Sequence, residues 1–565
     1  MIKFRIVALI LALMMTIMLG TACSSKTEEA KTTDTTEVTD SKEVTYKDTI
    51  VYALWSSPDG FFNPALSSTI YDEAVDQLVY DSMISFDKDM NIVPLMADSY
   101  EVSEDEKTIV FNLKEGMKWH DGEAVTTDDI VFTFESLANK DYTGPYSNVV
   151  EGLEGYEAYH NGEAENLSGI KVDGQTVSFT LGDVYAPALM NIGGFDIIPK
   201  HVWESVPVAE WGTASELLAS PVGCGPYKFE EYEDGHHLKL TANENYFDGE
   251  VATKNFIFRI TSRDNVQVQL ENGEVDIADI SDMKPSDIEA LKTNGIETES
   301  FANNLVQYMG FNLRDERFKD ERVRAAFMYG LDRQLMVDTL VAGKGQLVNT
   351  PMIPSGWAYP SEDMLLSYEY DIEKAKALLK EAGWEDRDQN GIIEDEAGNE
   401  FKIVLTYPTG DKAREESAPI IQSYVKELGI DMDLEMLEFK ATMAKVVGNH
   451  EFDVYLMGNS VGSDPDPKPY WHSTAMSNEK GVYAWNIAGF ANEEADKLME
   501  AGLATTSQEE RKEIYNKFGV LMNKELPWAT LYSKDIIMAH NPKIENYHPS
   551  TYTKFVDVED WKIEN

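Results

Sequence analysis

Strand-like and helix-like segments alternate between residues 304 and 535, and this alternation limits the folds open to the chain. Apolar runs typical of strands occur at 401–408, 430–437 and 452–458, and a helix-patterned segment occupies 415–429. Short connections between such segments favour a mixed or parallel sheet with helices packed on it. The second half of the chain is therefore predicted to contain an α/β layer.

Two further segments of this half have the period of an amphipathic helix. Within residues 319–343 one helical face carries Val323, Ala326, Phe327, Gly330 and Leu331. Residues 370–383 show the same period and stop at Gly383, because a glycine after the last turn readily adopts the left-handed conformation that ends a helix. We expect both helices to cover a sheet.

The first half of the chain has a different pattern. Residues 47–300 are rich in short alternating apolar runs that are typical of strands, with helices between them. The chain has 565 residues, of which 43% are hydrophobic. That is enough to build more than one domain.

The amino terminus has the pattern of an export signal. Lys3 and Arg5 precede an uncharged apolar run at residues 6–19, which is too short for an ordinary membrane span. The run ends at "LGTAC", which resembles a bacterial lipobox and implies cleavage after residue 22 and lipidation of Cys23. Plain secretory cleavage near Ala22 is the alternative. Residues 23–46 are rich in Thr, Glu, Lys and Asp, and we interpret them as a disordered tether.

The net charge limits the kinds of partner that are expected, and the cysteine content limits the disulfides. With 48 basic and 100 acidic side chains the formal charge is −52. Such a charge repels phosphate backbones, so a nucleic-acid partner is not expected. Beyond Cys23 the only cysteine is Cys224, so no internal disulfide is expected. We predict a monomer without a cofactor.

A serine-hydrolase motif occurs at residues 458–462. "GNSVG" matches G-x-S-x-G, in which the serine sits on a sharp turn between a strand and a helix. Here prolines at 465, 467 and 469 prevent a helix from starting directly after Ser460. We therefore predict that the protein is not an enzyme.

One acidic loop matches part of a calcium-binding pattern. Asp386, Asp388 and Asn390 occupy the first, third and fifth places, and Glu394 the ninth. The twelfth place is Ala397 rather than glutamate. A solvated turn is favoured, with a weak structural calcium site as the alternative. The chain contains no Cys/His cluster of zinc-ligand spacing, and no other metal is expected.

Several strings together resemble a known family. "VPLMADSYEVSEDEKTIVFNLKEGMKWHDGEAVTTDDIVFTFE" (93–135) contains L-x-x-G-x-K-W-x-D-G-x-x-V-T-x-x-D, and "GCGPYKF" (223–229) resembles G-T-G-P-Y with Cys224 in the threonine place. "NENYFDGE", "LENGEVDIAD", "FNLRDERFKDERVRAAFMYGLDR" and "YDIEKAKALLKEAGW" follow in order. The chain is similar to family 5 extracellular solute-binding proteins, the oligopeptide-, dipeptide- and nickel-binding group of ABC importers.

This resemblance implies a fold, partners and a location. The fold would be α/β and two-lobed, of the periplasmic-binding-protein type II (cluster C), with a hinge and a small extra subdomain. Lobe I would comprise 47–81, 198–303 and 536–565, its subdomain 82–197, and lobe II 304–535. The protein would be held by its N-terminal lipid on the outer face of a bacterial cell membrane. There it would deliver a solute to the permease of an ABC importer.

The resemblance also implies a ligand site. In peptide-binding relatives, backbone after an early D/N-P turn pairs with the peptide as an added strand, which places Ser68 and Ile70 here. The implied cleft residues also include Trp55, Tyr146, Phe439, Asn459, Ser460, Asp464, Trp471 and Tyr532. Trp55, Tyr146 and Trp471 lie in polar, proline-containing loops, as do Phe61, Phe62, Trp357, Tyr359 and Tyr470, and loops often carry binding residues.

One departure from the family pattern concerns specificity. Relatives carry W-x-x-D-x-x-D/E-P, whose first aspartate accepts hydrogen bonds from the peptide ammonium. In this chain Gly458 occupies the tryptophan place and Val461 the aspartate place. Asp464 or Asp466 is a possible substitute. Oligopeptides are the expected ligands, and an oligosaccharide or a metal chelate is the alternative.

Overall fold

The computed structural model describes residues 44–565. The expected signal peptide, the lipidation site at Cys23 and most of the expected tether lie outside this range. Residues 46–565 form one compact unit, which begins where Tyr46 forms a β-bridge with Glu564. No helix in the described part of the chain is both long and apolar enough to cross a membrane.

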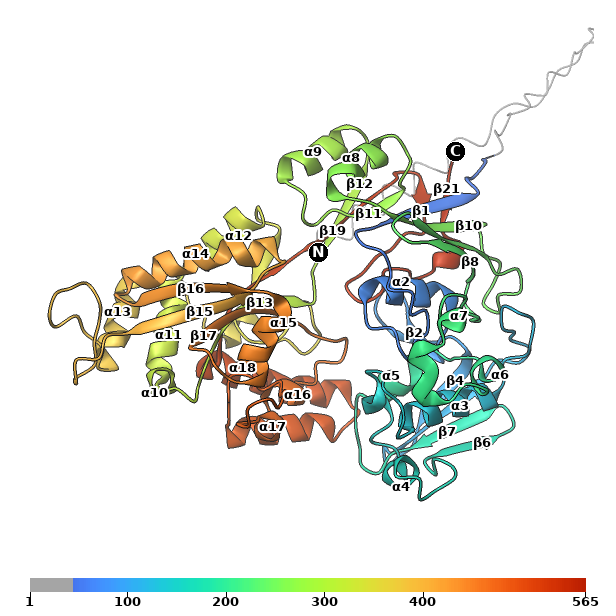
Figure 1. Ribbon diagram of the computed structural model, residues 1–565, viewed down its shortest axis with the longest axis horizontal. Helices are drawn as coiled ribbons and strands as arrows, with labels where there is room; N and C mark the ends of the chain where they lie inside the picture. Colours follow the sequence, from blue (N-terminus) through green and yellow to red (C-terminus); the bar gives the residue numbers. More distant parts are fainter. Residues whose placement is uncertain (1–43) are drawn as a thin grey trace, which may run out of the picture. The chain divides into compact units, whose positions relative to one another are not determined.

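A seven-stranded mixed sheet carries the start and the end of this unit (Figure 1). The central strand β1 runs parallel to both of its neighbours, and the other pairs are antiparallel. The strands, in spatial order, are β12 (Glu297–Phe301), β19 (Ile536–His540), β11 (Ile277–Asp279), β1 (Thr49–Leu54), β10 (Asn255–Ile260), β9 (His237–Ala242) and β8 (Tyr227–Glu233). Helices α8 (Arg263–Glu271) and α9 (Pro285–Thr293) pack against this sheet through a small apolar cluster.

A four-stranded antiparallel sheet lies within residues 97–180. Its strands, in spatial order, are β4 (Ala97–Val102), β5 (Thr108–Leu113), β7 (Thr176–Thr180) and β6 (Ile170–Asp173). Buried and partly exposed residues alternate along β5, so that Ile109, Phe111 and Leu113 face the core. Strict alternation is what a strand with one buried face requires. Helix α3 (Thr127–Ala138) shares this core.

Shorter elements complete the same region. They are α2 (Ile70–Val79), β2 (Ile84–Phe86), β3 (Ile92–Pro94), α4 (Tyr156–His160), α5 (Ala188–Gly193), α6 (Lys200–Trp203), α7 (Ser215–Leu218), β20 (Ile544–Glu545) and β21 (Lys562–Ile563).

Two of the sequence strings that resemble the family contact each other. His120, from "KWHDGE", donates its backbone N–H to the carbonyl of Gly223 at 2.8 Å, and its Nδ1 accepts the N–H of Gly223 at 3.2 Å. Burial lowers the pKa of His120 to about 4, so the ring is neutral and its Nε2–H donates to the Gly225 carbonyl. A Cβ at Gly223 would lie 1.8 Å from the carbonyl oxygen of Val79, so this position needs glycine.

A six-stranded mixed sheet is built from residues 305–534. Its strands, in spatial order, are β14 (Gly345–Leu347), β18 (Trp528–Lys534), β13 (Leu305–Phe311), β17 (Val454–Ser460), β15 (Lys402–Pro408) and β16 (Asp431–Leu437). Strand β15 is parallel to β16 and β17, as strand–helix alternation predicts. Together the sheets confirm the predicted α/β class.

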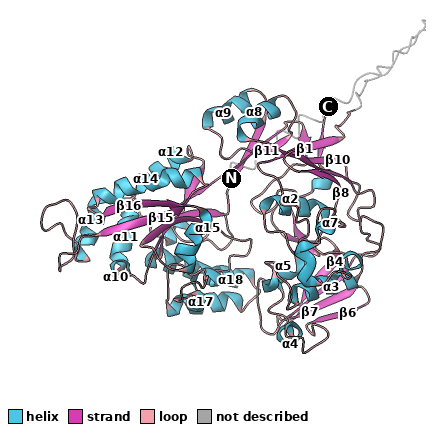
Figure 2. Cartoon of the chain, viewed as in Figure 1, coloured by secondary structure: helices cyan, strands magenta, loops and turns pink. Residues whose placement is uncertain are grey.

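Helices cover both faces of this sheet (Figure 2). Successive residues of β13, β17 and β18 point to opposite faces, so Met309, Leu456 and Ala529 join one core, and Tyr308, Tyr455 and Trp528 the other. The first core includes residues of α11 (Glu321–Gly330), α12 (Arg333–Leu340), α13 (Ile372–Glu381) and α14 (Lys412–Glu427). The second includes residues of α16 (Lys468–Trp471), α17 (Glu493–Leu503) and α18 (Gln508–Glu525).

One predicted helix, at 319–343, differs in detail from the structure. The segment 319–343 is divided into α11 and α12, because the Asp332 side chain accepts the Leu335 N–H and caps a new helix. The short helix α15 (Phe439–Thr442) continues as a π-helix at Met443–Gly448. The end of α13 matches the prediction, since Gly383 has φ +95°.

The described chain passes twice between the two large sheets. The first passage joins β12 to β13 through residues 302–304, and the second joins β18 to β19 at Asp535. Both connections are therefore short.

Candidate functional site

A cavity of about 600 Å³ is lined by distant parts of the chain. Lining residues lie within 86–109 and 181–190, within 351–359, within the loop that follows β17, and on α18. Its aromatic lining consists of Phe86, Tyr100, Tyr185, Trp357, Tyr359, Tyr470 and Tyr552. A cavity of this size with aromatic walls suits a small ligand.

The loop after β17 enters this cavity from the end of a strand. β17 pairs with β13 as far as Ser460, opposite Leu305. Beyond the strand, the Val461 N–H donates to the Asn304 carbonyl at 2.9 Å, and the Tyr552 hydroxyl donates to the Gly462 carbonyl at 3.1 Å. These bonds hold the loop from two sides.

Ser460 lacks the setting of a hydrolase nucleophile. A nucleophile elbow needs a helix that starts directly after the serine. Here the next helix, α16, begins only at Lys468, as the prolines predict.

Asp464 is neutralised by an arginine from α18. Arg511 donates from Nη1 and Nη2 to the two carboxylate oxygens of Asp464, at 2.7 and 2.8 Å. Its Nε–H donates to the Gly502 carbonyl at 2.9 Å, and the guanidinium lies 5.4 Å from the ring centres of Trp357 and Tyr515. The Asp464 carboxylate therefore holds the loop in place through its ion pair with Arg511. Because its charge is already paired, it is not available to bind a charged ligand.

Asp466 lines the same cavity without an ion-pair partner among residues 44–565. One carboxylate oxygen accepts the Lys468 backbone N–H at 2.9 Å. Burial raises its pKa to about 6, and the charge of Asp464 adds to this, while the Lys468 N–H and the charges of Arg511 and Lys468 oppose it. Burial, followed by the charges of Asp466 and Asp464, raises the pKa of Tyr185 to about 12. The cavity thus holds a carboxylate that makes no ion pair within residues 44–565.

Two other carboxylates line the cavity, and of these only Asp89 makes an ion pair within residues 44–565. Asp89 pairs with Lys88 at 2.7 Å, and Glu106 accepts the Thr506 N–H at 2.8 Å.

Three of the residues implied by the resemblance line the cavity, namely Asn459, Val461 and Asp464. Val461 packs against the apolar cluster of Val306, Val348 and Ile353. The place at which relatives carry an aspartate is therefore an apolar contact in this protein.

Three aromatic residues of the implied site are held by other contacts and do not line the cavity. Trp471 is 2% exposed and packs edge-on against Trp528, with ring centres 4.4 Å apart. Tyr532 is fully buried, with its hydroxyl 3.2 Å from the hydroxyl of Ser417. Tyr146 donates its hydroxyl to the Ser67 carbonyl at 2.8 Å.

The remaining implied residues also lie outside the cavity lining. Trp55 lies 5.7 Å from the Arg263 guanidinium. Ser68, Ile70, Phe439 and Ser460 are exposed.

Arg511 is a site residue that sequence reasoning did not find. It lies within a helix 47 positions from its partner, and nothing local distinguishes it from the other charged residues of α18. Of the aromatic residues in proline-containing loops, Trp357, Tyr359 and Tyr470 line the cavity, whereas Trp55, Phe61, Phe62, Tyr146 and Trp471 do not.

Comparisons with known proteins agree with this architecture. The family model of bacterial extracellular solute-binding proteins, family 5 (middle region), matches residues 91–481. The oligopeptide-binding protein AppA of Bacillus subtilis is 29% identical over 88% of this chain and 89% of its own length. Heme-binding protein A of Haemophilus influenzae is 28% identical over 89% and 90%.

Solved structures show the same fold. Bacillus subtilis AppA in complex with a nonapeptide has a TM-score of 0.74 and 26% identity, covering 93% of this chain and all of that one. The ABC transporter substrate-binding protein CtaP of Listeria monocytogenes has a TM-score of 0.77 and 26% identity, covering 92% and 100%. These matches confirm the two-lobed α/β fold, and the family confirms that the protein is not an enzyme. The chain belongs to the family 5 bacterial extracellular solute-binding proteins.

Proposed function

We propose that this protein captures oligopeptides in the cavity and delivers them to the permease of an ABC importer. The observation that carries the proposal is the carboxylate of Asp466, which lines the aromatic cavity and makes no ion pair within residues 44–565. A peptide ammonium would balance that charge through charge-assisted hydrogen bonds. Aromatic faces bind apolar side chains without a strict shape requirement. The relative AppA, an oligopeptide-binding protein solved with a nonapeptide, supports the same ligand class.

We further propose the domain ranges and the anchoring inferred from the sequence. Lobe I would comprise 47–81, 198–303 and 536–565, with the subdomain 82–197, and lobe II would comprise 304–535. Residues 302–304 and Asp535 would form the hinge, and the ligand would favour the closed form by its higher affinity for it. Lipidated Cys23 and its tether would hold the protein at the outer face of the cell membrane.

The direct test is to identify what the cavity binds. Mass spectrometry of ligand released from protein purified under native conditions should detect peptides. Calorimetry on protein stripped of ligand and refolded should then show saturable binding of those peptides. Stabilisation by oligosaccharides or metal chelates, with none by any peptide pool, would reject the peptide assignment.

Binding of a peptide with a free amino terminus is expected to weaken in acid. The pKa of Asp466 is about 6, and the peptide ammonium, with a pKa near 8, stays charged below neutrality. Only ionised Asp466 attracts the ammonium, so we expect about a tenfold loss of affinity between pH 7.5 and pH 5. Calorimetry in buffers of matched ionic strength measures this. An N-acetylated peptide should show no such change, and an equal loss for both peptides would remove Asp466 from the explanation.

A further inference from the structure

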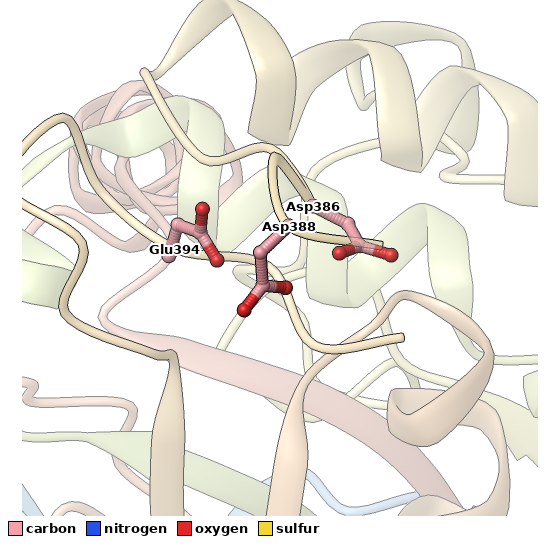
Figure 3. A group of neighbouring side chains, drawn as sticks. All are labelled: Asp386, Asp388 and Glu394. Atoms are coloured by element: carbon pink, nitrogen blue, oxygen red, sulfur yellow. The ribbon is translucent and has the colours of Figure 1, made fainter. Parts of the chain in front are cut away.

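Three carboxylates converge in the loop between α13 and β15, away from the ligand cavity. Asp386, Asp388 and Glu394 each present an oxygen atom, and these atoms all lie within 4.8 Å of one another (Figure 3).

Two of these residues, Glu394 and Asp386, have carboxylate oxygens without a partner in the described chain, although Asp386 Oδ2 accepts the Gly391 N–H at 3.0 Å. The Glu394 side chain is 7% exposed and makes no hydrogen bond or ion pair among the described residues. Its backbone is fixed by bridges to Glu385 and Glu400, so the residue is well anchored. The Oδ1 atom of Asp386 is also buried and lacks a hydrogen-bond partner. A buried carboxylate oxygen without a partner is costly and requires an explanation.

Basic side chains of this loop do not supply the missing partner. Arg387 donates to the backbone carbonyls of Gly383, Glu394 and Asp395. Lys380 pairs with Glu385 at 2.7 Å, and Lys402 pairs with Glu400 at 2.7 Å.

We propose that Asp386, Asp388 and Glu394 bind a calcium ion. Ca²⁺ binds oxygen ligands at about 2.3–2.6 Å, so oxygens on one ion can lie up to about 5 Å apart. Mg²⁺ needs shorter bonds of about 2.0–2.1 Å in strict octahedral geometry, which suits this spread less well. Gly391 has φ +92° and makes the sharp turn at the sixth place of the calcium pattern. Because the Glu394 side chain has no hydrogen-bond or ion-pair partner in the described chain, a calcium site is favoured over the solvated turn that the sequence suggested.

The ion would stabilise the half of the protein that contains the six-stranded sheet. Ile393, next to Glu394, is 8% exposed and joins the core of that sheet. Trp384 packs on Phe401, with ring centres 4.4 Å apart. Because Ala397 replaces the bidentate glutamate of the twelfth place, the expected Kd is weak, about 10⁻⁴–10⁻³ M, as in extracellular calcium modules. The inference does not depend on which solute the cavity binds.

The test uses the full chain after removal of divalent ions. Titration with CaCl₂ should raise the Tm saturably, with a smaller effect of MgCl₂ at equal concentration. Tb³⁺ should compete with Ca²⁺ and show luminescence excited through tryptophan, since Trp384 lies two residues from Asp386. Glu394→Gln is expected to weaken calcium binding about tenfold or more, because it removes one of the three ligand charges.

The matched control is Glu396→Gln, which removes the same charge from an exposed residue of the same loop. It should retain the calcium response. In chelator, Glu394→Gln should be at least as stable as the parent protein, because it relieves repulsion among three neighbouring carboxylates. A parent protein that shows no saturable calcium response up to about 10 mM, ten times the weakest expected Kd, would overturn the proposal. An equal response in the two variants would also overturn it.

Discussion

Replacing Arg511 with methionine is expected to lower the free energy of unfolding by about 3–5 kcal/mol, because it leaves Asp464 charged and unpaired in a largely buried site. The side chains of Arg511 and Asp464 are only 6% and 19% exposed. Methionine keeps much of the apolar stem that packs near Trp357 and Tyr515, so the loss reports mainly the charge. Denaturant unfolding followed by tryptophan fluorescence measures it.

Two control variants distinguish the loss of the Arg511–Asp464 ion pair from a general effect of removing a positive side chain. The double variant Arg511→Met/Asp464→Asn removes both charges and should be clearly more stable than Arg511→Met alone. Lys497→Met breaks the exposed pair with Glu493 on the neighbouring helix α17 and should change stability little. If the single and double variants were equally unstable, the ion pair would not be the cause.

Replacing Asp466 with asparagine is expected to weaken binding of a peptide with a free amino terminus by about 30-fold or more. That factor corresponds to the lower end of the 2–5 kcal/mol that truncation of a buried charge pair costs. Asparagine retains an oxygen that can accept the Lys468 N–H, so the loop geometry should persist. Calorimetry with free and N-acetylated forms of one peptide measures the effect, and the acetylated form should bind both proteins alike.

The same variant should be more stable than the parent protein at neutral pH. Burial raises the pKa of Asp466 from 3.8 to about 6, so the folded state holds its proton more tightly than the unfolded state. Its ionisation therefore lowers stability as pH rises from about 4 to about 6, and the deficit persists at pH 7. Weaker binding together with higher stability cannot arise from misfolding. Asp89→Asn is the matched control, because Asp89 lines the cavity but already pairs with Lys88. If it lost as much affinity, Asp466 would have no special role.

Much of the fold could be read from local patterns. The strands predicted at 401–408 and 430–437 correspond to β15 and β16, because alternation and apolar runs reflect burial in a sheet directly. The position of Gly383 marked the end of α13 for an equally local reason. The long helix predicted at 319–343 was less successful, since periodicity continued across the cap at Asp332 that divides it.

The site was predictable only as a region. Family motifs drew attention to the loop at 458–467, and loop aromatic residues pointed to the cavity walls. Trp471 and Tyr532 have the residue types of a binding site but lie in the core. Whether an aromatic side chain faces a cavity or a core depends on packing with distant segments, and no local pattern records that.

Residue order and composition alone determine that this chain forms an α/β protein of the solute-binding family, since periodicity and motif spacing are properties of neighbouring residues. Tertiary structure decides the roles of two aspartates that differ by two positions. Arg511 comes from a distant helix and neutralises Asp464, whereas Asp466 lines the same cavity without an ion pair in the described chain. A carboxylate's function depends on which charges and which solvent surround it, and only the folded chain brings those together.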